Sequence, residues 1–157
     1  MNHLSTSQIF QKVRRMLGAA PPHRVQVAAL PWRRVKGGIE VMLITSRDTG
    51  RWVLPKGWPE AGEEFYDAAA REAVEEAGLK GIISSHEAGR YFYDKCAANR
   101  DDIRCEVFVY PLEVSNVADK WKEKGERKRK WVSPDKAAGM VAEPDLAEVI
   151  RNFRRTA

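Results

Sequence analysis

Cysteine and histidine are scarce in this chain of 157 residues. It has two cysteines, Cys96 and Cys105, and three histidines, His3, His23 and His86. Two cysteines are too few for a disulfide framework, and the scattered histidines lack the spacing of zinc ligands. No apolar run approaches the length of a membrane span, and the N-terminus shows no signal-peptide pattern. We therefore expect a cytoplasmic protein with reduced thiols.

The composition also lacks the signs of disorder, because 43% of the residues are hydrophobic and five are tryptophan. The length fits one domain with a substantial core. The net charge of +5 suits a polyanionic partner. The most basic stretch, residues 120–130, could bind nucleic acid or could be an ordinary solvated loop. We favour a polyphosphorylated small molecule over nucleic acid as the partner, and the sequence does not indicate the oligomeric state.

The pattern of apolar residues predicts an α+β fold. A helical extension is expected over residues 1–22, where apolar residues recur at helical spacing until Pro21 and Pro22. Residues 23–157 would form the main domain. Its predicted strands cover residues 25–31, 41–44, 52–54, 82–83, 89–93, 104–114 and 131–132, and its predicted helices cover residues 63–77 and a segment after Pro144. Because strands and helices do not alternate strictly, we expect a mixed sheet between helices.

The most informative segment is Gly57–Leu79. It contains the pattern Gly-x5-Glu-x7-Arg-Glu-x-x-Glu-Glu-x-Gly, in which all seven fixed positions are occupied. At roughly 7% usage per residue, seven fixed positions coincide by chance on the order of once in 10⁸ trials. Gly62 with Pro59 would form a turn before the helix, and Gly78 would end the helix in the left-handed conformation.

Three carboxylates share one face of the predicted helix, because Glu72, Glu75 and Glu76 are spaced i, i+3 and i+4. The three negative charges repel one another, but a hard divalent cation bound between their oxygens makes the arrangement favourable. The alternative is an ordinary solvated acidic face. The residues expected on the opposite, core-facing side are Tyr66, Ala70, Ala73, Val74 and Ala77.

Arg71 has two possible roles. It could pair with Glu63 and brace the turn, or it could contact phosphate. We favour the brace, because Arg71 lies beside Glu75 and two helical turns from Glu63.

The Gly57–Leu79 pattern is the Nudix box, and the chain resembles a Nudix hydrolase over residues 23–153. The resemblance implies an α/β/α sandwich with a mixed sheet, and hydrolysis of a phosphoanhydride with Mg²⁺ or Mn²⁺. It implies that Glu72 and Glu76 are the principal metal ligands and that Glu75 is a further or water-mediated ligand. The carbonyl of Gly57 would complete the site, and Glu63 with Arg71 would be the bracing pair.

Segments outside the box are similar to those of diphosphoinositol polyphosphate phosphohydrolases, namely residues 45–47, 51–57 and 127–131. That group usually has Gly-Gly after its proline, whereas Pro55 is followed here by Lys56-Gly57, a form also seen in diadenosine polyphosphate hydrolases. The resemblance implies that basic side chains surround the substrate. The candidates are Arg24, Arg47, Lys56, Arg104, Arg127 and Arg129.

The expected reaction is attack of an activated water on phosphorus, with cations neutralising the phosphate oxygens. A carboxylate must accept the proton of the water, and the sequence leaves six candidates for this general base. Two are in the box, Glu72 and Glu75, and four are outside it, Asp101, Asp102, Glu106 and Glu113. A hydrolase of nucleoside triphosphates or nucleotide sugars is an alternative. The rival from a different class is a ligand sensor or RNA-binding module, which commonly lacks box carboxylates that this chain retains.

Overall fold

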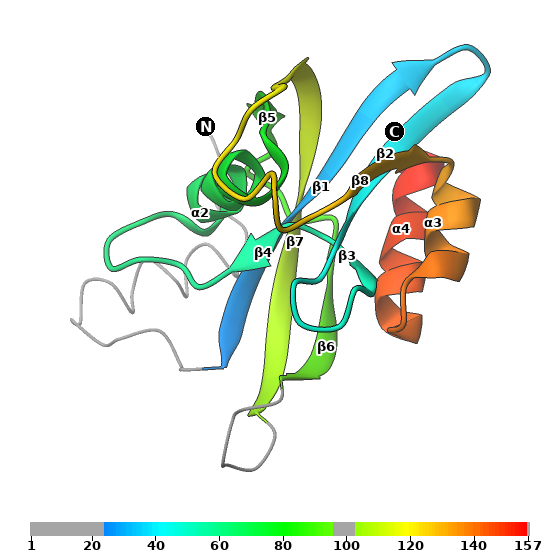
Figure 1. Ribbon diagram of the computed structural model, residues 1–157. Helices are drawn as coiled ribbons and strands as arrows, with labels where there is room; N and C mark the ends of the chain where they lie inside the picture. The colour runs from blue at the N-terminus through cyan, green and yellow to red at the C-terminus, as the bar shows by residue number, and fades with distance from the viewer. Residues whose placement is uncertain (1–23, 96–102, 157) are drawn as a thin grey trace, which may run out of the picture.

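The computed structural model describes residues 24–95 and 103–156 (Figure 1). The helix predicted within residues 1–22 lies outside these ranges, so its prediction stays open. The same holds for Cys96 and for two of the candidate bases, Asp101 and Asp102.

A mixed sheet of eight strands forms the centre of the fold. Its strands are β1 (Val25–Val35), β2 (Gly38–Thr45), β3 (Trp52–Val53), β4 (Lys56–Gly57), β5 (Leu79–Ile83), β6 (Gly89–Lys95), β7 (Ile103–Val117) and β8 (Arg129–Val132). The main order is β3-β2-β1-β7-β5, while β4 pairs with β1, β6 with β7 and β8 with β2. Only β1 and β7 run parallel among these pairs. The predicted mixed sheet is confirmed.

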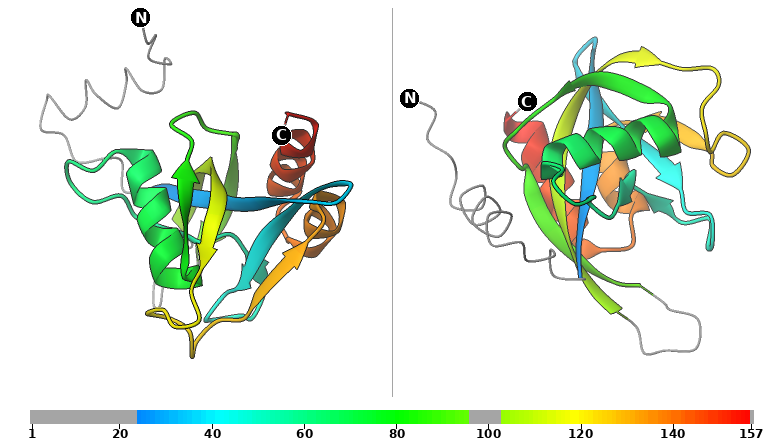
Figure 2. Two further views of the ribbon diagram at one scale, coloured as in Figure 1. Left: turned by 90° about the horizontal axis from the view of Figure 1, so that it is seen from above. Right: turned by 90° about the vertical axis from the view of Figure 1, so that its left-hand side faces the viewer.

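Helices cover both faces of the sheet. They are α2 (Phe65–Glu72), the π-helical turn η1 (Ala73–Ala77), α3 (Pro134–Met140) and α4 (Pro144–Thr156). Figure 2 shows α2 on one side of the sheet and α3 with α4 on the other. The α/β/α sandwich of the α+β class is therefore confirmed.

The alternation of side chains in β7 divides the core into two halves. Val107 and Val109 pack towards Ile150 of α4, whereas Phe108 and Tyr110 pack on the face that α2 covers. Successive side chains of a strand point to opposite faces, so one strand supplies both halves. This agrees with the alternation predicted for residues 104–114.

The helix of the Gly57–Leu79 segment differs from its prediction at both ends. It begins at Phe65 instead of Glu63, and its last turn is π-helical, with the amide of Gly78 donating to Ala73. Because a π-helical turn bonds i to i+5, the residues after Ala73 leave the 3.6-residue spacing. Val74, predicted to face the core, is 37% exposed. Gly78 does adopt the predicted left-handed conformation, with φ of 65°.

Candidate metal centre and substrate pocket

A pocket of about 760 Å³ lies where β4 meets the C-terminal half of the helix α2–η1. Its other walls come from the loop after β2, the end of β6 and the segment before β8. Glu72, Glu75 and Glu76 all line this pocket. The helix therefore presents its three box carboxylates to one cavity, although its last turn is not α-helical.

Two of the three carboxylates are buried. Glu72 and Glu76 are each 8% exposed, whereas the side chain of Glu75 is 34% exposed. Burial raises the pKa of Glu72 above its usual value and raises the pKa of Glu76 to about 7. Burial disfavours the charged form of a carboxyl group, so such a site gains from a cation placed beside it.

Gly57 lies directly against Glu72. A Cβ atom at position 57 would fall 2.2 Å from Oε1 of Glu72, which no side chain could occupy without displacing the carboxylate. The antiparallel pairing of Gly57 with Val27 anchors this strand to β1. Any larger residue at position 57 would therefore shift the buried carboxylate of Glu72.

Arg71 joins the turn to the helix through two hydrogen bonds to Glu63. Its Nε donates to Oε2 over 3.0 Å and its Nη2 donates to Oε1 over 2.9 Å. Nη2 also donates to the carbonyl of Trp58, and Nη1 donates to Glu72 over 2.9 Å. These hydrogen bonds from Arg71 hold the pKa of Glu63 below its usual value.

A second arginine holds Glu76. Arg127, whose side chain is 7% exposed, donates from Nη2 to Oε1 of Glu76 and from Nη1 to the carbonyl of Thr45, each over 3.0 Å. The other oxygen of Glu76 accepts from the backbone amide of Lys56 over 3.2 Å. Both oxygens of this carboxylate therefore have fixed partners.

The donor chemistry of the site fits a hard divalent cation. Within the described ranges, no group of three acidic, histidine or cysteine side chains is placed so that it could hold a metal ion. Arg71 lies 2.9 Å from Glu72 and 3.7 Å from Glu75, while Arg127 lies 3.0 Å from Glu76. The carboxylates thus pair with arginines here, but carboxylate oxygens are the type of ligand that Mg²⁺ and Mn²⁺ prefer.

Comparison with known families gives a match between the NUDIX domain and residues 22–155. The chain belongs to the Nudix family. It is 33% identical over 135 residues to Nudix hydrolase 21, chloroplastic, of Arabidopsis thaliana, covering 83% of this chain and 66% of the relative. It is 35% identical over 120 residues to diphosphoinositol polyphosphate phosphohydrolase 3-beta of Bos taurus, covering 73% of this chain and 69% of the relative.

The fold is also that of solved Nudix structures. A binary complex of the Caenorhabditis elegans Ap4A hydrolase superposes with a TM-score of 0.63 at 22% identity, covering 84% of this chain and 96% of the other. The chain spans between 59% and 66% of the length of five Arabidopsis relatives that it matches.

The predicted basic residues of this Nudix domain separate into two groups. Lys56, Arg47 and Arg127 line the pocket. The other three, Arg24, Arg104 and Arg129, do not line it.

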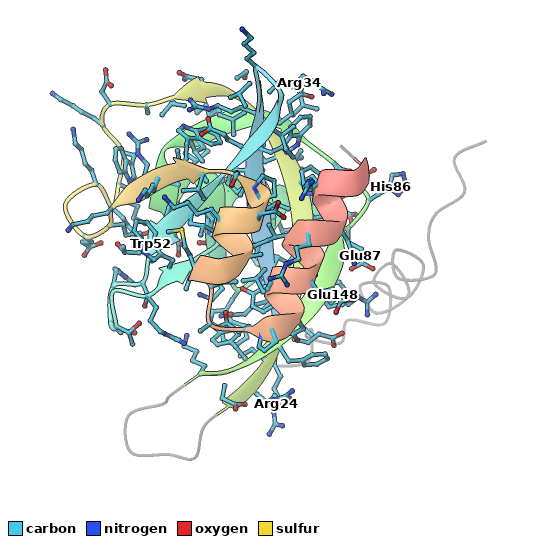
Figure 3. The ribbon with its side chains drawn as sticks, turned by 90° about the vertical axis from the view of Figure 1, so that its right-hand side faces the viewer. Arg24, Arg34, Trp52, His86, Glu87 and Glu148 are labelled. Carbon is cyan, nitrogen blue, oxygen red and sulfur yellow. The ribbon has the colours of Figure 1, made fainter. Side chains whose placement is uncertain are left out.

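These three arginines have other positions. Arg24 is exposed at the start of β1, at one end of the molecule (Figure 3). Arg104 lies 3.5 Å from Asp94 on the surface. Arg129 donates to the backbone carbonyl of Ala77 at the end of η1 and to that of Ala118. The sequence shows only that these residues are basic, which does not distinguish them from the basic residues that line the pocket.

The candidate proton acceptors also separate. Glu72 and Glu75 line the pocket, whereas Glu106 and Glu113 do not. Glu106 instead lies 3.3 Å from Arg90. Glu106 and Glu113 belong to β7 and lie outside the pocket. Of the candidate bases that the structure describes, only the box carboxylates Glu72 and Glu75 therefore line it.

Five acidic residues of the pocket were not among the candidates of the sequence analysis, and Glu123 and Glu143 are the least exposed of them. Glu123 and Glu143 line the cavity, with side chains 12% and 13% exposed. Glu123 lies 3.1 Å from Arg47, and Glu143 lies 3.9 Å from Arg51. Neither belongs to a local pattern, because each reaches the pocket from a connection far from the box in sequence.

Proposed function

We propose that this Nudix domain is a Mg²⁺- or Mn²⁺-dependent hydrolase that cleaves a phosphoanhydride bond of a polyphosphorylated substrate. One observation carries the proposal: the buried carboxylates of Glu72 and Glu76 meet Gly57 in a pocket that also contains Lys56 and Arg47. The names of the relatives, which include hydrolases of a diphosphoinositol polyphosphate and of Ap4A, support the same reaction class.

The metal ligands would be Glu72, Glu75, Glu76 and the backbone of Gly57. A bound divalent cation would neutralise phosphate oxygens and lower the pKa of a water molecule. The pocket needs such cations, because its lining contains eight aspartates and glutamates against six lysines and arginines. A polyphosphate would otherwise meet a surplus of negative charge.

The side chains of the pocket would bind and orient the substrate and deprotonate the attacking water. Lys56 and Arg47 would hold phosphate oxygens, since charge-assisted hydrogen bonds to phosphate are strong. Glu75, which at 34% is more exposed than Glu72 or Glu76, or Glu72 would take the proton of the attacking water. Arg71 would keep Glu63 and the preceding turn against the helix while the reaction proceeds.

Among the two substrate classes expected, the pocket favours a dinucleoside polyphosphate over a diphosphoinositol polyphosphate. The eight aspartates and glutamates of the lining outnumber its six lysines and arginines, so the net charge of the pocket does not favour a densely phosphorylated ring. Trp58, which is 38% exposed, lines the same cavity and offers an aromatic face to a base.

A substrate panel tests the proposal. The protein is incubated with dinucleoside polyphosphates, diphosphoinositol polyphosphates, nucleotide sugars and nucleoside triphosphates, with Mg²⁺ or Mn²⁺ and then with chelator. Hydrolysis of a dinucleoside polyphosphate that stops with chelator is expected. No product from any substrate would refute the enzyme and favour the ligand sensor or RNA-binding module.

The cellular location is also a proposal. No helix among the described residues is long and apolar enough to cross a membrane. The names of several plant relatives include mitochondrial or chloroplastic. We retain the cytoplasm as the predicted location, which localisation of the tagged protein in its source cells would test.

A further inference from the structure

The π-helical turn η1 ends in backbone carbonyls that a distant segment caps. The amide of Glu123 donates to the carbonyl of Glu75 over 3.2 Å. The indole Nε1 of Trp121 donates to the carbonyl of Glu76 over 3.0 Å. Helix ends leave such carbonyls without partners inside the helix, so donors from elsewhere must satisfy them.

Arg129 completes this cap. Its Nη1 donates to the carbonyl of Ala77 over 2.9 Å and to the carbonyl of Ala118 over 3.0 Å. Its guanidinium also stacks on Trp121, with Cζ 3.7 Å from the ring centroid. One arginine thus joins the end of η1, the segment after β7 and the indole that caps Glu76.

Trp121 packs directly on the glycine that ends the helix. A Cβ atom at Gly78 would fall 2.9 Å from both Cβ and Cγ of Trp121, and Gly78 has φ of +65°. Glycine is therefore favoured at position 78 for two reasons, the left-handed backbone conformation and the close approach of Trp121.

We propose that Trp121 and Arg129 are positioning residues for the metal centre. They would hold the π-helical turn so that the carboxylates of Glu75 and Glu76 face the pocket. Neither side chain lines the pocket, so they would act through the helix and not by touching substrate. This inference rests on the proposed metal-dependent function, and it assigns part of the basic stretch 120–130 to a cap for the metal-binding helix.

The test uses Arg129→Met and Trp121→Phe, with Lys130→Met as the matched control. Lys130 is an exposed neighbour in the same strand, so its substitution removes the same charge without touching η1. The probe is Mn²⁺ alone, titrated by calorimetry. We expect the dissociation constant for Mn²⁺ to rise about tenfold in both test variants. This is the lower end of the effect seen when a residue that supports a metal ligand is removed. Lys130→Met should bind as the unsubstituted protein does, and Arg129→Lys should recover part of the affinity.

A second measurement does not need the metal. Amide hydrogen exchange at Glu76, Ala77 and Gly78 should be faster in Arg129→Met than in Lys130→Met, while exchange at Ala68 stays unchanged. Activity assays on any substrate found should show a lower kcat at limiting Mn²⁺ with an unchanged KM for substrate. A residue that only supports the fold would lower Tm without this separation.

The outcomes distinguish the two proposals. If the unsubstituted protein binds no Mn²⁺ but exchange accelerates as expected, the metal function fails and the cap stands. If the unsubstituted protein binds Mn²⁺, an unchanged Mn²⁺ affinity in Arg129→Met would overturn the positioning role, whatever the exchange rates are. If Trp121→Phe does not fold, Arg129→Met and Arg129→Lys decide the result.

Discussion

Arg127 and Glu76 form a buried ion pair, with Nη2 3.0 Å from Oε1 and side chains only 7% and 11% exposed. The two residues are 51 positions apart in the sequence. A pair of this kind has lost most of its hydration, so each charge depends on the other. This dependence makes the stability of the metal-free protein a direct probe of the site.

Arg127→Met should therefore destabilise the metal-free protein. Removing one partner leaves the carboxylate of Glu76 buried without its cation, which costs about 3 kcal/mol. Urea unfolding in the presence of chelator measures the loss. Arg47→Met is the control, because Arg47 is 54% exposed and its contact with Glu123 should contribute little. Equal effects of the two substitutions would contradict a special role for the buried pair.

Glu63→Gln should lower the free energy of unfolding near neutral pH by about 1.5–3 kcal/mol, the range of a hydrogen bond to a charged group. The pKa of Glu63 is depressed because Arg71 donates to it. Its stabilising effect is therefore present above the unfolded pKa and is lost as pH falls through the folded pKa. The difference between the two proteins should shrink in denaturation curves recorded at progressively more acidic pH, below about 4.

Glu60→Gln is the matched control for this pair. Glu60 belongs to the same turn but is 71% exposed and lies 3.9 Å from Arg71. We expect it to change stability by a few tenths of a kcal/mol at most. A pH-independent effect of Glu63→Gln would show that the carboxylate charge is not what stabilises the turn.

Divalent cations should raise the melting temperature of this protein, and chelator should reverse the shift. A ligand that binds only the folded state stabilises it by mass action. Glu76→Gln should abolish most of the shift and reduce hydrolysis by orders of magnitude while the protein stays folded. Glu106→Gln should leave both unchanged, because Glu106 pairs with Arg90 outside the pocket. Full retention of metal-induced stabilisation in Glu76→Gln would remove Glu76 from the ligand set.

Gly57→Ala should impair metal binding by displacing the Glu72 carboxylate. The added Cβ would lie 2.2 Å from Oε1, so the side chain of Glu72 must move. We expect at least a tenfold weaker affinity for Mn²⁺, measured by titration. Gly125→Ala is the control, since a Cβ there meets nothing within 4 Å. An unaltered Mn²⁺ affinity in Gly57→Ala would mean that Glu72 can leave this position without consequence.

Local spacing was sufficient to place a helix in the box, although not its ends, and to predict the two-sided strand β7. Glu72, Glu75 and Glu76 reach one pocket because their separation along the chain already places them on one side of a helix. The alternation of β7 follows in the same way from the two-residue period of a strand. The π-helical turn was not predictable from this spacing, because its carbonyls are satisfied by Trp121 and Arg129.

Contacts across the sheet decided everything else about the site. The pairing of β8 with β2, which places Arg129 opposite Ile44, brings Arg127 to the carbonyl of Thr45 and to Glu76. The sequence pattern of the box helix is local, since it depends on bonds between neighbouring residues. The roles of the arginines depend instead on strand pairing between distant segments. That pairing decides which arginine would neutralise the helix, which would cap it and which stays at the surface, and only the folded structure contains this information.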